Sequence, residues 1–99
     1  MKLLTKEMIK RFKEIGNQEE VHQEEVLLIC KFFCPWNNWS WYASEYDSKT
    51  RIFFGYVEGH ECEWGYFSLS ELESVQGPVG LTIERDLYFS EIPFKNLRE

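Results

Sequence analysis

Aromatic residues crowd the middle of this chain and alternate there with small or polar residues. Eight Phe, five Tyr and four Trp make seventeen aromatic side chains, and thirteen of them lie between Phe32 and Phe67. The run from Trp39 to Tyr46 alternates with a period of two, which is typical of a β-strand that buries one face. The centre of the chain therefore predicts a β-sheet rich in aromatic side chains.

Turn-forming residues divide this predicted sheet into strands. Residues 35–38, 47–50 and 59–61 contain the Pro, Asn, Asp, Ser and Gly residues that favour turns. Connections this short join antiparallel neighbours. We expect about five strands, which cover residues 26–34, 39–46, 52–58, 62–67 and 81–89.

Two helices are predicted outside the sheet. Apolar residues recur at three- and four-residue spacing between positions 4 and 15, with Thr5 as a cap and Gly16 as a stop. Two overlapping Ser-x-x-Glu capping boxes, at Ser68 and Ser70, begin a short helix before the last strand. A chain of 99 residues has room for one domain. We therefore expect a single α+β domain over residues 1–99, in which the N-terminal amphipathic helix packs on the antiparallel sheet.

The charge of the chain argues against duplex nucleic acid as a ligand. The formal net charge is −6, yet residues 1–15 carry five Lys and Arg against Glu7 and Glu14. That local +3 leaves −9 on the other 84 residues, a body that repels phosphates. The same acidity is compatible with an antagonist that occupies the basic surface of a nucleic-acid enzyme.

The cysteines and the N-terminus predict a cytoplasmic protein. Cys30 and Cys34 on one strand would stand about 13 Å apart, which exceeds the roughly 7 Å that a disulfide allows. No stretch reaches the length of a membrane span, and the N-terminal residues lack the apolar core of a signal peptide. We expect a reducing compartment and no membrane contact.

Four segments of the chain resemble a known family. They are residues 31–35 (KFFCP), 41–47 (WYASEYD), 63–72 (EWGYFSLSEL) and 77–89 (GPVGLTIERDLYF). Together they resemble the bacterial family called domain of unknown function 2958, over most of the chain after residue 30. Cys62 and Trp64 depart from the usual pattern of that family. The resemblance implies a fold but no activity, and a bacterial gene of the kind often carried on plasmids and other mobile elements.

A polar cluster near the C-terminus is the first candidate binding site. On a strand, Arg85 would point inward with Ile83 and would need a carboxylate partner, for which Glu45 is the first candidate and Glu63 the second. With Glu84 and Asp86, these residues could form the pocket of a small ligand-binding protein or hydrolase. The alternative is a structural ion pair at the end of the sheet.

Aromatic side chains form the second candidate site. Trp36 lies in a turn, where it would be an exposed interface anchor or a lid folded back on the sheet. Tyr42 and Tyr46 fall on the strand face opposite Trp39, Trp41, Ala43 and Glu45, so they belong to the same candidate surface. Trp39, Trp41, Trp64 and Tyr66 are expected in the core.

No catalytic set, metal site or cofactor motif is found in the sequence. His22 and His60 lie in turns or loops without partners at metal-ligand spacing, and residues 77–80 lack the lysine and the spacing of a phosphate loop. We therefore predict a non-enzymatic protein-interaction module with an unidentified protein partner. Single-stranded nucleic acid stacked on the aromatic face is a further alternative, and the oligomeric state is left open.

Overall fold

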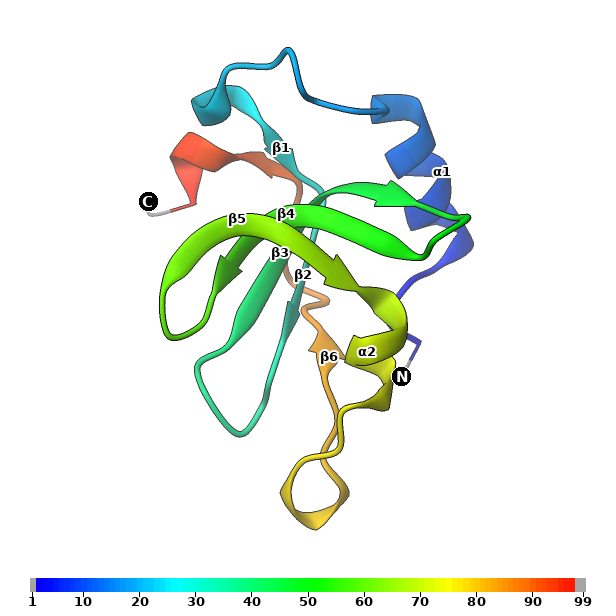
Figure 1. The fold of residues 1–99 in the computed structure, drawn as a ribbon, viewed down its shortest axis with the longest axis vertical. Coiled ribbons are helices and arrows are strands. Elements are labelled where there is room, and N and C mark those ends of the chain that lie inside the picture. Colours follow the sequence, from blue (N-terminus) through cyan, green and yellow to red (C-terminus); the bar gives the residue numbers. More distant parts are fainter. Residues whose placement is uncertain (1, 98–99) are drawn as a thin grey trace.

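A five-stranded antiparallel sheet forms the centre of the fold in the computed structural model, which describes residues 2–97 (Figure 1). The strand order is β5-β4-β3-β2-β6, and every neighbouring pair is antiparallel. The predicted α+β class is confirmed. The strands are β2 (Cys30–Phe33), β3 (Ser40–Asp47), β4 (Ile52–Glu58), β5 (Cys62–Ser68) and β6 (Glu84–Arg85).

Helices α1 (Lys6–Ile15) and α2 (Leu69–Ser74) begin at capping residues that the sequence predicted. The backbone N–H of Met8 donates to Thr5 Oγ1 over 3.2 Å, and Glu71 N–H donates to Ser68 Oγ over 3.2 Å. Side-chain oxygens at these positions satisfy N–H groups that have no partner within the helix. Residues 2–97 also contain three single-turn helices: η1 (Gln23–Glu25), η2 (Pro78–Gly80) and η3 (Phe94–Asn96).

The strand predicted over residues 26–34 is two strands that belong to different sheets. Residues Leu27–Leu28 form β1, which pairs with β7 (Ile92–Pro93) in a separate two-stranded sheet. The N–H of Phe94 donates to Val26 O over 2.8 Å, so the C-terminal segment continues this pairing. Residues 26–34 are apolar except for Lys31, and this pattern contains no sign of the break, because burial against either sheet requires the same residue types.

The last predicted strand, residues 81–89, is reduced to the two residues of β6. Asp86 ends it, since its Oδ1 accepts a hydrogen bond from Tyr88 N–H over 2.9 Å. Asp side chains that bind the backbone two residues ahead stabilise turns in preference to strands. The prediction of a nine-residue strand there was wrong in length and correct in position.

A β-bulge in β3 changes which residues face the core. The register with β4 shifts between Ala43 and Glu45, which leaves Ser44 as an extra residue. Its Oγ donates to Phe54 O over 2.9 Å. One extra residue reverses the faces of everything that follows it. Tyr46 therefore packs against the core and Glu45 lies on the other face, the reverse of the predicted alternation.

The core lies between one face of the five-stranded sheet and the two helices. Phe53 has no exposed surface and is its most connected ring. Its centroid lies 4.7 Å from that of Tyr46, 5.1 Å from Phe67, 5.3 Å from Phe32 and 5.9 Å from Phe12. Other buried members are Leu3, Leu4, Cys30, Cys34, Ala43, Leu69, Leu72 and Ile83.

The opposite face of the sheet carries a second aromatic cluster under the C-terminal segment. Phe94 lies 4.8 Å from Tyr56 and 4.9 Å from Trp64, measured between ring centroids, and Phe89 lies 5.7 Å from Tyr42. Trp64 was expected in the main core, and this cluster places it on the other side of the sheet. The chain therefore uses aromatic packing on both faces.

Val79, at the tip of the loop that contains η2, has a strained backbone. Its φ is 49°, a left-handed value that is unfavourable for a β-branched residue, and its side chain is 96% exposed. Because asparagine tolerates this conformation, we expect Val79→Asn to raise the free energy of unfolding by about 1 kcal/mol in urea denaturation. The control is Val75→Asn, where φ is −68° and no gain is expected. Equal effects at both positions would contradict the strain argument.

Candidate functional site

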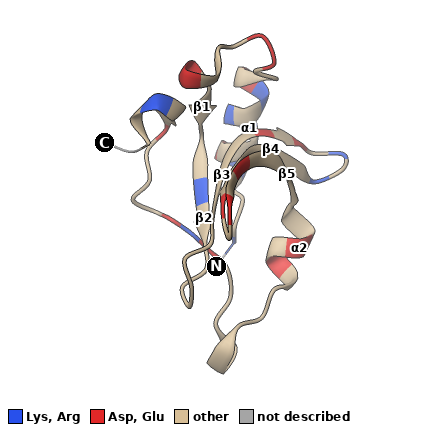
Figure 2. Ribbon diagram, turned by 60° about the vertical axis from the view of Figure 1, so that its left-hand side comes forward, with Lys and Arg blue, Asp and Glu red and all other residues tan. Residues whose placement is uncertain are grey.

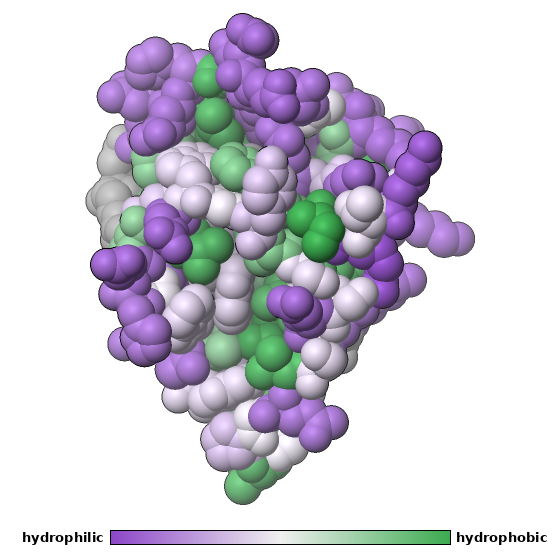
Figure 3. All heavy atoms as spheres, viewed as in Figure 1, coloured by the Kyte–Doolittle hydropathy of each residue, from purple (hydrophilic) through white to green (hydrophobic). Residues whose placement is uncertain are grey.

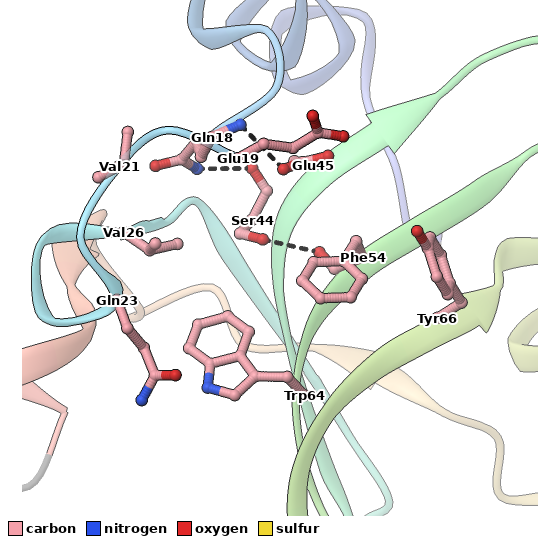
Figure 4. Close-up of a pocket in the computed structure, with 10 residues that line it drawn as sticks. All are labelled: Gln18, Glu19, Val21, Gln23, Val26, Ser44, Glu45, Phe54, Trp64 and Tyr66. Carbon is pink, nitrogen blue, oxygen red and sulfur yellow. Dashed lines mark hydrogen bonds between the residues drawn. The ribbon is translucent and has the colours of Figure 1, made fainter.

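A hollow of about 390 Å³, here called the loop pocket, lies between the loop that follows α1 and the strands β3, β4 and β5 (Figure 4). The loop covers the side of the sheet that also carries Trp64, so two segments far apart in the sequence form its walls. Hydrophilic residues cover the molecule where the loop and α1 lie, and more hydrophobic ones lie over the sheet below (Figure 3). The strand residues that line the pocket are Ser44, Glu45, Phe54, Trp64 and Tyr66.

Gln18 fastens the loop to the sheet. Its side-chain Nε2 donates to Leu27 O over 3.0 Å and to Ser44 O over 2.9 Å, and its Oε1 accepts from Leu27 N–H over 2.8 Å. Its backbone N–H donates to Glu45 Oε2 over 2.9 Å. Only 6% of this residue is exposed. Gln18 therefore sets the position of the loop over the bulge, although a single polar residue in a polar segment carried no sequence signal of burial.

Three aromatic rings form one wall of the loop pocket. Phe54 and Trp64 are nearly parallel, with an interplanar angle of 16° and centroids 6.0 Å apart. Tyr66 meets Phe54 edge to face at 4.9 Å and is 79% exposed, although it was expected in the core. Among the described residues, Trp64 Nε1 is the buried side-chain polar atom without a hydrogen-bond partner. Figure 4 shows it on the side of the indole that faces Gln23.

Two carboxylates, Glu19 and Glu45, give the loop pocket a negative charge. The five ion pairs of the described residues use Glu14, Glu25, Glu73, Asp86 and Glu91 instead. Acidic residues gather on the loop before β1 and on α2, whereas α1 is basic (Figure 2). Within residues 2–97, therefore, neither pocket carboxylate is neutralised by an ion pair.

A second hollow of about 560 Å³ lies on the other side of Tyr66 and shares Glu45, Phe54 and Tyr66 with the loop pocket. It extends toward the C-terminal end of α1, where Lys13 contributes to its lining, and toward Asp47 at the end of β3. Tyr66 therefore stands between two depressions.

The structure does not bring Arg85 and Glu45 together. Arg85 points to the core side, as predicted, but its Nη1 donates to the backbone oxygens of Lys2 over 2.7 Å and Leu3 over 2.9 Å. Arg85 on β6 pairs with Phe32 on β2, and Phe32 pairs with Trp41 on β3. Trp41 lies four residues before Glu45 on the same strand. The bulge then turns Glu45 to the opposite face. The predicted pairing of these two residues was wrong because the N-terminal segment supplies the acceptors.

The other members of the predicted polar cluster are also dispersed. Glu63 is exposed on the outer strand β5, and three strands separate it from β6 at the other edge. Asp86 Oδ2 lies 3.8 Å from Lys31 Nζ, and Glu84 pairs with Phe33 on β2. Of the five predicted residues, Glu45 is the one that lines the loop pocket.

The predicted aromatic surface is mostly covered. Trp36 is half-buried against the core, and a Cβ built at Gly77 would lie 2.6 Å from its ring, so it is a lid and not an exposed anchor. Tyr42 is buried, with its hydroxyl 3.2 Å from Glu58 Oε1. Tyr46 packs on Phe53 and lines the second hollow. Sequence reasoning also missed Tyr66, because strand alternation predicted burial, whereas its position on the outer strand β5 leaves the side chain exposed.

Reactive groups are few among residues 2–97. Burial raises the pKa of the Cys30 thiol to about 12, despite the nearby positive charge of Arg85, so its reactive thiolate is scarce at neutral pH. In the same range, no three His, Cys, Asp or Glu side chains gather where they could hold a metal ion. No helix in this part of the chain has the length and hydrophobicity to cross a membrane.

Comparisons with known proteins give one match. A family model described as a protein of unknown function (DUF2958) matches residues 3–94, which contain both helices, the five-stranded sheet and the loop pocket. Curated proteins and solved structures give no match.

Proposed function

We propose that this chain, which belongs to the DUF2958 family, is a protein-interaction module that binds an extended segment of a partner along β5, with Tyr66 as its anchor. The observation that carries the proposal is the exposure of Tyr66, 79% of which is open to solvent between two hollows. Tyrosine is enriched among the residues that contribute most to binding at protein interfaces. The adjacent hollows offer space for the partner's side chains on both sides of the ring.

The backbone of β5 supports this mode of binding. Strand β5 is the outer strand of its sheet, and within the described residues it pairs with β4 alone. A strand at an edge presents unpaired N–H and C=O groups, to which an extended peptide can add as a further strand. A Cβ built at Gly65 would meet no atom within 4 Å, so the face of β5 opposite Tyr66 is also open at this position.

The proposal includes the cellular location of this chain and the origin of its partner. Free thiols at Cys30, Cys34 and Cys62 support a reducing cytoplasm. The resemblance to genes carried on mobile elements supports a plasmid or host protein as the partner. An acidic antagonist of a nucleic-acid enzyme is one case of this function, since such enzymes present basic surfaces.

Site-specific photocrosslinking tests the proposal. With p-benzoylphenylalanine in place of Tyr66, irradiation of cells that naturally carry this gene should give a discrete adduct with one partner protein. The control carries the same group in place of Lys10, which is exposed on α1. The proposal fails if position 66 gives no adduct, or if both positions give the same set of adducts.

A further inference from the structure

We propose that the loop pocket receives one arginine side chain of the partner segment that lies along β5. This inference rests on the proposed function, and it adds the chemical class of the partner: a basic segment with an extended backbone. The pocket volume of about 390 Å³ is sufficient for one long side chain. Three features of the protein indicate that the occupant of the pocket is a cation, and one of them favours arginine over lysine.

The aromatic wall is the first feature. Phe54 is the middle ring of that wall, and its centroid lies 6.0 Å from that of Trp64 and 4.9 Å from that of Tyr66. The faces of aromatic rings attract cations, and tryptophan does so most strongly. A planar guanidinium also stacks on such rings, which an ammonium group cannot do. This geometry favours arginine.

The carboxylates are the second feature. Glu19 and Glu45 line the pocket, and no described Lys, Arg or His forms an ion pair with either one. Gln18 N–H binds Oε2 of Glu45, and no described residue donates to its Oε1. Figure 4 shows both carboxylates at the upper end of the pocket, with Trp64 at the lower end. A guanidinium would find carboxylate acceptors and a stacking surface in the same cavity.

The overall charge is the third feature. Beyond residue 15 the chain carries a net −9, which raises the local concentration of basic partners and speeds their association. An anionic ligand would meet two unneutralised carboxylates. A purely apolar side chain would leave them without a partner and would bury the side chain of Gln23, which is exposed in the free protein. The lining therefore fits a cation better than either alternative.

Calorimetric titration of the full chain with matched peptides tests the inference. The probe is a capped threonine-valine peptide with one central arginine, and its control replaces arginine by citrulline, which is similar in shape but neutral. We expect the arginine peptide to bind about tenfold more tightly, since its cation would lie on aromatic rings and beside two carboxylates. The preference should shrink in 0.5 M salt. Equal affinity for the two peptides would overturn the assignment.

Variants of single carboxylates locate the effect. Glu45→Gln keeps an oxygen that can accept from Gln18 N–H but removes the charge, and Glu19→Gln removes the second charge. Each should reduce the preference for arginine several-fold. The matched control is Glu20→Gln, because Glu20 is exposed on the same loop and does not line the pocket. An equal loss in Glu20→Gln would show general charge attraction and would overturn the pocket assignment.

The two proposals fail in different ways. If crosslinks form at position 66 but both peptides bind alike, β5 docking holds and the arginine assignment is overturned. If the arginine peptide is preferred but position 66 gives no adduct, the cation pocket holds and docking along β5 is overturned.

Discussion

Replacement of Phe53 by alanine is expected to lower the free energy of unfolding by about 3 to 5 kcal/mol. Phe53 has no exposed surface and contacts the rings of Phe12, Phe32, Tyr46 and Phe67. Alanine at this position leaves a cavity that the rigid strands around it fill only in part. Domains of this size are stable by about 5 to 15 kcal/mol, so the variant should be close to unfolding at ordinary temperature.

Urea denaturation followed by far-ultraviolet circular dichroism measures this effect. If Phe53→Ala does not fold, Phe53→Leu provides a smaller change at the same position and should still lower the unfolding midpoint. The control is Tyr66→Ala, where the exposed ring should affect stability by about 0.5 kcal/mol or less. If Phe53→Ala unfolds at the same urea concentration as Tyr66→Ala, the assignment of Phe53 to the core is contradicted.

Replacement of Gln18 by alanine is expected to cost about 3 kcal/mol and to release the loop from the sheet. The substitution removes the side-chain partners of Leu27 N–H, Leu27 O and Ser44 O. Buried backbone groups without partners destabilise the folded state, and hydration of these groups requires the loop to move away. Because this loop forms one wall of the pocket, Gln18→Ala should also weaken binding of the arginine peptide.

Amide hydrogen exchange gives the most direct readout. The Leu27 amide donates to Gln18 Oε1, so its protection should fall in Gln18→Ala. The Phe53 amide lies on β4, which has a paired strand on each side, and it should keep most of its protection. The matched control is Gln76→Ala, an exposed glutamine in the loop after α2. Unchanged protection of Leu27 would show that Gln18 does not hold the loop in place.

Local sequence signals predicted the helices accurately. Thr5 and Ser68 cap α1 and α2 through bonds to residues three positions ahead, and Gly16 ends α1 with a φ of 69°. These interactions depend on neighbours within one helical turn, so they can be read from short patterns. The turns between β3, β4 and β5 were equally local, and their positions were predicted.

The partners of the candidate site residues could not be predicted locally, because they come from segments that are distant in the sequence. The single residue inserted at Ser44 reversed the faces of Glu45 and Tyr46, and strand alternation alone contains no sign of such an insertion. Arg85 was correctly predicted to point inward, but its acceptors come from Lys2 and Leu3, more than eighty residues away. Pairing between residues this far apart depends on topology and not on local pattern.

Periodicity, turns and caps act over a few residues, so they were sufficient to predict an aromatic antiparallel sheet with two capped helices. Which carboxylate and which tyrosine reach a common surface depends on the folded arrangement. The loop pocket combines Gln18 and Glu19 with Glu45, Trp64 and Tyr66, which meet through the bulge in β3 and the exposed edge of β5. Periodicity specifies the type of each element, whereas strand register and edge position specify which residues are neighbours and which are exposed.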